Sequence, residues 1–442
     1  MSYNLQMKKL KRYTHLFYLF IFIAPLISLL CYFLAPQLLP NTGMVNWLAL
    51  LLAAIIILSP YGSIKLISTT HPRESITFSL WLTQILLLEI ALFMMYIGMC
   101  QLNNLTEPLL LASLSQSLRH MGLFPFALIA ISAAGFGITT TCRQKDSYFD
   151  TIAIGSFQKQ FEPLAITIRT FGRALTLFAL AISAGMATLA TVSVLCGTEN
   201  LNGILGLSLP ATGAAFVMLL LAMRKNSHPA LIAIQIERPA LGFLMNMLIW
   251  VIFLALFSLL LHGHKAPKLG MPAALEHLFT DGWLLHWQLF SLTWWFMIVP
   301  ITAITIARLC YGYSLRALLL ATLALPALLA GLIQNLPAWL VNNSTLTKAL
   351  TLIGFILFLV SILNKNTLPM VSQTYLPKTK TIKHRSEVIF NDRWKRLCGL
   401  FFYLFIPGGI IVLSLLLSLF LLPAALIFLL VLLNLIKLLI RR

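Results

Sequence analysis

The sequence predicts an all-α polytopic membrane protein with about twelve transmembrane helices, judged from run lengths and composition. Of its 442 residues, 60% are hydrophobic and only 10% are charged, a balance that soluble globular proteins do not have. Apolar runs long enough to cross a bilayer, which takes about 20 residues in a helix, recur along the whole chain. The net charge of +19 is therefore attributed first to membrane topology and not to nucleic-acid binding.

A short basic arm, residues 1–14, precedes the first apolar run. No small-residue cleavage site is clear after that run, so we expect a retained first span and not a removed signal peptide. The last stretch, 397–442, is too long for one crossing at about 1.5 Å of rise per residue, and we divide it near 418–421 into two spans. The other expected spans are about 15–35, 44–60, 78–100, 122–140, 170–196, 209–223, 240–262, 285–309, 315–333 and 347–364.

The distribution of basic residues gives an independent check on the number of spans. With twelve spans and a cytoplasmic N-terminus, only four of the 31 Lys and Arg residues fall on the external side: Arg119, Lys265, Lys268 and Lys348. Because Lys and Arg concentrate on the cytoplasmic side, a miscount by one span would invert the pattern from that point on. We therefore expect both termini in the cytoplasm, and a basic face that attracts anionic lipids.

Motifs for enzymatic or metal chemistry are missing from the sequence. The six cysteines are scattered without a C-x-x-C pair, and His262 and His264 supply too few ligands for a metal. No Walker loop, G-x-S-x-G or H-E-x-x-H motif occurs. We expect neither an enzyme nor a bound cofactor, and no direct coupling to a nucleotide.

The most distinctive stretch is 286–316, which holds the pair Trp294 and Trp295 in mid-span, followed by Pro300. Tryptophan usually marks the edge of a membrane. A pair at mid-depth is better suited to lining a cavity for a cation, because the face of an indole ring attracts positive charge. The alternative is that both rings only pack against other helices.

This stretch resembles the signature helix of the betaine/choline/carnitine transporter family, roughly W-x3-YW-x-WW-x-x-W-x-PF followed by an ARIS-x-GR-T-x-R loop. Leu292 and Ile298 stand where the family has two further tryptophans. Residues 59–66 resemble the family's S-R-Y-G-x-I-R-L segment, and 120–127 resemble its H-W-G-L-H-x-W-A segment. The residues of 286–316 that fall on the signature are Trp287, Trp294, Trp295, Pro300, Ala307, Arg308, Gly312 and Arg316.

The resemblance implies a LeuT-like fold of two five-helix inverted repeats, with the substrate held at mid-membrane. The repeats would be 78–262 and 285–442, within one transmembrane domain, 15–442, and 15–60 would form two additional helices. The function implied is secondary-active transport of a small organic solute across the inner membrane of a bacterium. The solute would be a quaternary ammonium compound such as betaine, choline or carnitine, or a related amine or osmolyte. A homotrimer is also implied.

In that family an aromatic box from helices four and eight holds the quaternary ammonium group. Trp294 and Trp295 remain here, while Phe126 and Met121 stand where the family has tryptophans on helix four. Half a box therefore remains, and these four residues are the candidate substrate site. Ile129 replaces a family tyrosine.

Other family positions concern coupling and gating. Thr176 and Ser183 lie seven residues apart on one helix face, which in the family supplies oxygens to sodium. Hydrogen bonding to the backbone or to a neighbouring helix is the alternative role. Arg308 and Arg316 match arginines of the family's cytoplasmic loop. Their role can be to form gating salt bridges or simply to anchor the topology, and the sequence does not choose between the two.

Glu89 marks the largest departure from the family. The family has Gly-Met-Gly-Ile-Gly where this chain reads Glu89-Ile90-Ala91-Leu92-Phe93, so the segment is expected to stay helical and not to unwind. A carboxylate at mid-bilayer is costly and usually faces a cavity or a partner. It could carry a coupling proton, in place of sodium, or counter a cationic substrate. It could equally be a neutral, hydrogen-bonded acid that joins helices.

Two other classes of function stay open from the sequence. One is a membrane-embedded transferase that uses Glu89 and a histidine. The nine histidines are dispersed along the chain, which does not favour this class. The other is a decayed carrier that acts as a sensor or scaffold.

Overall fold

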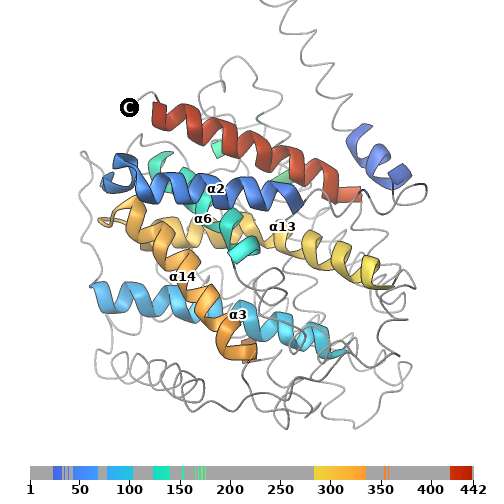
Figure 1. Ribbon diagram of the computed structural model, residues 1–442, viewed down its shortest axis with the longest axis horizontal. Coiled ribbons are helices and arrows are strands. Elements are labelled where there is room, and N and C mark those ends of the chain that lie inside the picture. Colours follow the sequence, from blue (N-terminus) through green and yellow to red (C-terminus); the bar gives the residue numbers. More distant parts are fainter. Residues whose placement is uncertain are drawn as a thin grey trace, which may run out of the picture.

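The computed structural model describes residues 23–31, 43–67, 77–102, 123–139, 283–334 and 419–440, together with single residues elsewhere. The described part is helical apart from its turns and one isolated β-bridge, which confirms the all-α prediction there (Figure 1). Its elements are α2 (Met44–Leu58), η2 (Pro60–Ser63), α3 (Phe78–Leu102), α6 (Leu123–Gly137), α13 (Trp283–Leu309), α14 (Leu315–Gln334) and the helix Leu419–Ile440.

Within the described residues, three helical segments are long and apolar enough to cross a membrane: Phe78–Tyr96, Ser291–Leu309 and Leu419–Ile440. These fall on the spans predicted at 78–100 and 285–309 and on the last predicted span. The part of 397–442 before Leu419 lies outside the described residues, so the division of this stretch into two spans stays a prediction. The protein is therefore membrane-embedded. The predicted spans 209–223 and 240–262 lie outside the described residues, and only single residues are described in 170–196 and 347–364.

Two helices are continuous at positions where the sequence raised the question of a break. α3 is continuous across residues 89–93, which confirms the expectation that this segment does not unwind. α13 is continuous through Pro300. Because proline has no N–H, the carbonyl of Phe296 loses the donor that a helix normally supplies from residue 300.

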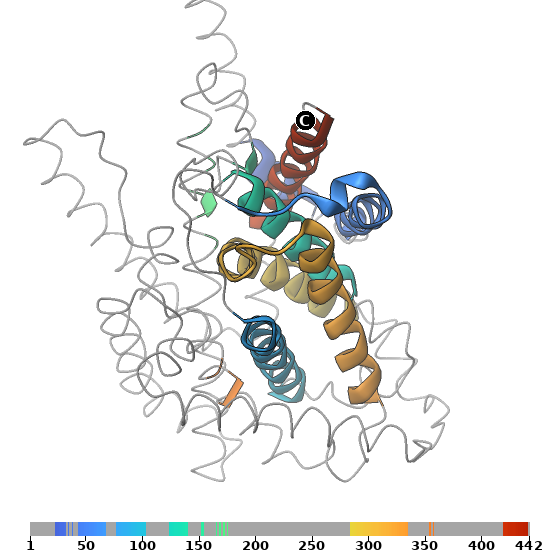
Figure 2. The same ribbon diagram turned by 90° about the vertical axis from the view of Figure 1, so that its left-hand side faces the viewer.

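Contacts at the helix ends fix the relative directions of the helices. The starts of α2 and α6 meet where the rings of Trp47 and Phe124 lie 4.1 Å apart, centroid to centroid. At the other end of α6, a Cβ added to Gly137 would lie 2.8 Å from Leu66, just past the end of α2. α2 and α6 therefore run in the same direction, as Figures 1 and 2 show.

α13 and the helix Leu419–Ile440 share this direction. A Cβ added to Gly43, before α2, would lie 3.8 Å from Leu292 near the start of α13, while Arg316, beyond the end of α13, hydrogen-bonds to the last turn of α2. Asn434 donates a hydrogen bond of 2.8 Å to the carbonyl of Ile152. Ile152 in turn lies against Gly135 near the end of α6, and Figure 1 shows the C-terminus on the same side as the end of α2.

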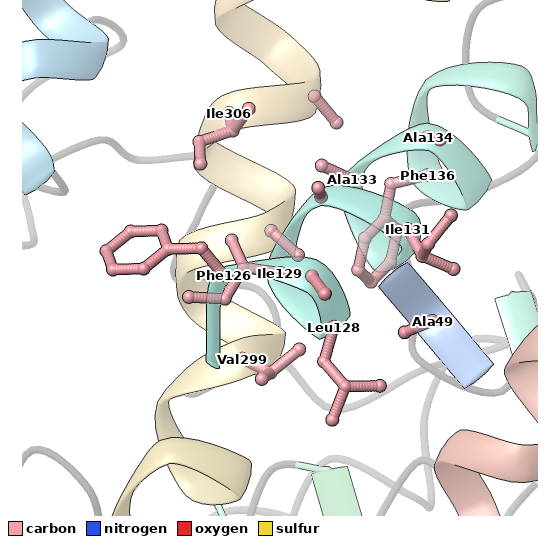
Figure 3. Close-up of a cluster of buried hydrophobic side chains, with 14 of the residues drawn as sticks. Ala49, Phe126, Leu128, Ile129, Ile131, Ala133, Ala134, Phe136, Val299 and Ile306 are labelled. Atoms are coloured by element: carbon pink, nitrogen blue, oxygen red, sulfur yellow. The ribbon is translucent and has the colours of Figure 1, made fainter. Parts of the chain in front are cut away.

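α6 is the central helix of the described part, with α2, α13 and α14 packed around it. Every side chain from Pro125 to Gly137 is buried. Its small residues, among them Ala130, Ala133 and Ala134, allow the neighbouring helices to approach closely. Figure 3 shows α6 side chains packed with Val299 and Ile306 of α13 and Ala49 of α2.

α2 lies at the periphery of the bundle. One of its faces is buried, including Ala49, Ala53 and Ile56, whereas its outer face is exposed and wholly apolar, with Trp47 60% and Leu58 85% exposed. A helix on the surface of a soluble protein would carry polar residues there. The outer face of α2 is therefore suited to lipid. Its residues are Met44, Trp47, Leu48, Leu51, Ala54, Ile55 and Leu58.

Two Tyr-Gly turns, distant in sequence, are joined where α2 and α13 end. Lys65 and Ser314 form an isolated antiparallel bridge, and three backbone hydrogen bonds of 2.9 Å link residues 64–66 to 312–315. Gly312 has φ = 89°, a left-handed conformation that favours glycine. Arg316 donates from Nε to the carbonyl of Ile57 (2.8 Å) and from Nη2 to that of Ser59 (3.1 Å). Arg316, in the first turn of α14, therefore caps the end of α2.

Candidate functional site

Five aromatic side chains from α3, α6 and α13 meet in the interior, and we call them the aromatic cluster. The Trp294 and Trp295 rings lie 4.7 Å apart and edge to face, and Phe126 lies 5.5 Å from Trp295. Tyr96 lies 5.8 Å from Trp295, and Phe93 is stacked on Phe126 at 6.0 Å. All five rings are buried, in arrangements that aromatic quadrupoles favour.

The structure brings together three of the four residues predicted for the substrate site: Trp294, Trp295 and Phe126. Two members of the cluster, Phe93 and Tyr96, were not predicted from the sequence. They lie four and seven residues after Glu89, so all three share one face of α3. This spacing from Glu89 is the feature of the sequence from which they could have been predicted. Met121, Thr176 and Ser183 lie outside the described residues, so their predicted roles stay predictions.

The cluster is anchored by a polar contact at its edge. The hydroxyls of Tyr96 and Ser291 lie 2.9 Å apart, and either can donate the hydrogen bond. This bond gives the phenol of Tyr96 a partner in the interior and fixes its ring against the two indoles.

Glu89 is fully buried and is the only acidic residue among those that the structure describes. Within this part of the chain, neither of its carboxyl oxygens has a hydrogen-bond partner. The amide of Gln84, five residues earlier on α3, likewise has none. Buried polar groups are normally hydrogen-bonded, so both exceptions require an explanation.

The contacts between α3 and α13 define what Glu89 faces. The two helices are antiparallel: Tyr96 contacts Trp295 at one end, and Trp81 Nε1 donates a 3.1 Å hydrogen bond to Cys310 Sγ at the other. Fifteen residues separate these anchors on each helix. Glu89 therefore lies level with the turn of α13 that contains Pro300 and Thr302, and Thr302 is on the same face as Trp295.

All four basic residues in the described part lie at one end of the bundle: Lys65, Arg308, Arg316 and Lys437. This is the end at which α2, α6 and α13 finish and α3 begins. Arg308, in the last turn of α13, also complements the negative end of the helix dipole. Glu89 lies between the two ends of α3, well separated from these cations, and the hydrogen bonds of Arg316 go to backbone carbonyls of α2.

Cys310 lies in the turn after α13 and belongs to a structural contact. Burial raises the pKa of its thiol to about 12, and the hydrogen bond from Trp81 acts in the opposite direction. The Trp81 ring is also stacked on Tyr313 at 4.4 Å. A buried thiol with such a pKa is inert as a nucleophile, so Cys310 is a packing residue of this junction.

The described residues hold no group of three or more His, Cys, Asp or Glu side chains that could bind a metal ion. Comparisons with protein-family models and with curated proteins found no match to the chain.

Proposed function

We propose that the protein is a secondary-active transporter that moves a small organic cation across the membrane by alternating access. The observation that carries this proposal is Glu89. It is a buried acid without a hydrogen-bond partner in the described part, and it lies on the face of α3 that also carries Phe93 and Tyr96 of the aromatic cluster.

Electrostatics favours a ligand at this position. Removing a carboxylate from water costs several kcal/mol, by order of magnitude, unless a partner charge and hydrogen bonds offset that cost. A cation beside Glu89 would supply the charge, and the aromatic faces next to it would add attraction for the same cation. Because the cluster is contributed by three helices, a shift of α3 relative to α13 and α6 would open it to one side.

The arrangement of the helices supports the fold that the betaine/choline/carnitine family implies. α3 and α13 would begin the two repeats, and they contact each other in antiparallel directions, as the first helices of inverted repeats should. α2, α6 and α13 run opposite to α3, as the predicted alternation of spans requires. By the positive-inside rule, the end that carries the four basic residues would be cytoplasmic, facing anionic lipid.

The proposed coupling ion is the proton. α3 has no unwound segment whose backbone could hold sodium, and it carries a titratable acid there instead. Glu89 would bind a proton in one orientation of the carrier and the substrate cation in the other.

Transport by proteoliposomes tests the proposed function. The purified protein is reconstituted, a proton or a sodium gradient is imposed, and accumulation of labelled amines, quaternary ammonium compounds and osmolytes is measured. Accumulation of at least one solute above that in protein-free liposomes is expected under the proton gradient. If no solute is accumulated or exchanged under either gradient, the chain is not a transporter of these solutes.

A further inference from the structure

We infer that the substrate is an amine cation that retains at least one N–H bond, and not a quaternary ammonium compound. This inference rests on the proposed function and names the class of substrate for the same site. Among the solutes that the family resemblance implies, it selects an amine over a quaternary ammonium compound.

Glu89 and the Thr302 hydroxyl, which lies level with it on α13, offer hydrogen-bond acceptors. The carboxylate offers two acceptor oxygens without partners in the described part. At the same level of α13, Thr302 already donates its hydroxyl hydrogen to the carbonyl of Ile298 (2.9 Å), so only its lone pairs remain. A ligand that donates hydrogen bonds matches this set of acceptors.

The rings of the aromatic cluster cover one another. Phe93 and Phe126 are stacked with an interplanar angle of 19°, and Trp294 meets Trp295 edge to face at 69°. A trimethylammonium group cannot donate hydrogen bonds and depends on several open aromatic faces around it. The cluster provides one aromatic wall, and Glu89 provides the charge.

A protonated primary, secondary or tertiary amine satisfies both features. Its N–H bonds would donate charge-assisted hydrogen bonds to Glu89, which are stronger than neutral ones. Its alkyl part would lie against the aromatic cluster. The unpartnered amide of Gln84 lies about 140° around α3 from Glu89, at 100° per residue, and so faces a different neighbour.

A methylation series on one skeleton tests this inference. Binding of ethanolamine, its N-methyl and N,N-dimethyl derivatives, and choline is measured on the purified full-length protein by titration calorimetry. We expect the three amines to bind and choline to bind about tenfold more weakly or worse, because its nitrogen has no N–H to donate to a buried charged acceptor. Glu89→Gln should reduce the amines to the level of choline.

Gln84→Leu is the matched control, because it removes another unpartnered polar side chain from the same helix but from a different face. It should leave the order of affinities unchanged. Glu89→Asp, which keeps the carboxylate, should keep the preference for amines even if binding weakens. Thermal melting of each variant shows whether it folds.

The inference is overturned if choline binds as tightly as the dimethyl amine, or if folded Glu89→Gln protein keeps the preference for amines. If choline or betaine is preferred and is accumulated by proteoliposomes, only the substrate class is wrong and the proposed transport stands. If no member of the series binds while another solute is accumulated, the inference alone is again wrong. If no solute binds and none is accumulated, both the inferred substrate class and the proposed function are wrong.

Discussion

The hydroxyl of Tyr96 on α3 lies 2.9 Å from that of Ser291 on α13. At the opposite end of the same antiparallel pair, Trp81 donates a hydrogen bond to Cys310. These two polar contacts fix the register of the helices on either side of Glu89. Any sliding of α3 along α13 would have to break both.

Removing the Tyr96–Ser291 hydrogen bond should destabilise the protein modestly. Tyr96→Phe and Ser291→Ala should each lower the free energy of unfolding by about 0.6–1.7 kcal/mol, the range found for hydrogen bonds between membrane helices. The double variant should lose little more than either single one, because both remove the same bond. Unfolding in denaturing detergent measures this, and strictly additive losses would show that the two hydroxyls act independently.

The indoles should contribute to binding of the substrate cation. Trp294→Leu and Trp295→Leu should each weaken binding by up to about 2 kcal/mol, the value for a desolvated cation over an aromatic face. Phe126→Ala should cost less, since a phenyl ring attracts a cation more weakly than an indole. Trp47→Leu, on the exposed outer face of α2, is the control and should bind normally. Unchanged affinity in both indole variants would leave these rings as packing residues.

Glu89 should couple transport to protons. Glu89→Gln should lose accumulation against a gradient, because the amide cannot take up and release a proton. At a substrate concentration that saturates its weakened site, it should still exchange substrate. Transport by the unaltered protein should depend on pH, stop with a proton uncoupler and continue without sodium. Sodium-driven accumulation, with Glu89→Gln accumulating normally, would make Glu89 a structural acid.

Few other titratable groups compete with Glu89 in the described part. Among the helices packed against α3, α13 carries Arg308 in its last turn and His286 near its start, and α14 carries Arg316 near its start. Both arginines lie at the basic end of the bundle, and His286 lies sixteen residues before Thr302. His286 is the only histidine among the described residues, so His286→Gln is the control for the pH dependence and should keep it.

Arg316 should stabilise the junction between α2 and the turn after α13. Arg316→Ala removes two hydrogen bonds, to the carbonyls of Ile57 and Ser59. It should lower the free energy of unfolding by about 1 kcal/mol, below the roughly 1.5–3 kcal/mol for charged groups, because the site is exposed. Arg316→Lys keeps the positive charge but cannot reproduce the forked geometry, so it should recover only part of the loss. Full recovery with lysine, seen in thermal melts, would indicate that charge alone matters.

The topology follows from the spans and the basic residues. Reporter fusions at residue 40 and within 265–280 should be external, and fusions within 145–160 and 370–390 and after residue 442 should be cytoplasmic. An external signal from the C-terminal fusion would contradict the division of 397–442 into two spans.

The helix boundaries were largely predictable because each apolar run is limited by polar or basic residues or by helix-breaking ones. The meeting of Phe126 with Trp295 was expected from the family pattern. The α3 residues Phe93 and Tyr96 were missed, because their role depends on how α3 packs against α6 and α13, which no local pattern encodes.

The partner of Arg316 could not be predicted for the same reason. As a basic residue after a span it indicates topology, whereas its actual acceptors are backbone carbonyls in another part of the chain. Backbone groups carry no sequence signal, so only the folded arrangement identifies them.

The junction of the two Tyr-Gly turns has a consequence for biogenesis. Ile57 and Arg316 are separated by 259 positions, so the end of α2 enters the membrane long before the residue that completes it exists. At about 5–20 residues per second, Arg316 is synthesised roughly 13–50 seconds after the end of α2. During this time the last carbonyls of α2 lack the Arg316 donor and must accept hydrogen bonds from water or lipid headgroups. A residue from the later part of the chain therefore completes the cap of α2. A nascent chain halted before Arg316 would expose an uncapped helix end to the quality-control machinery.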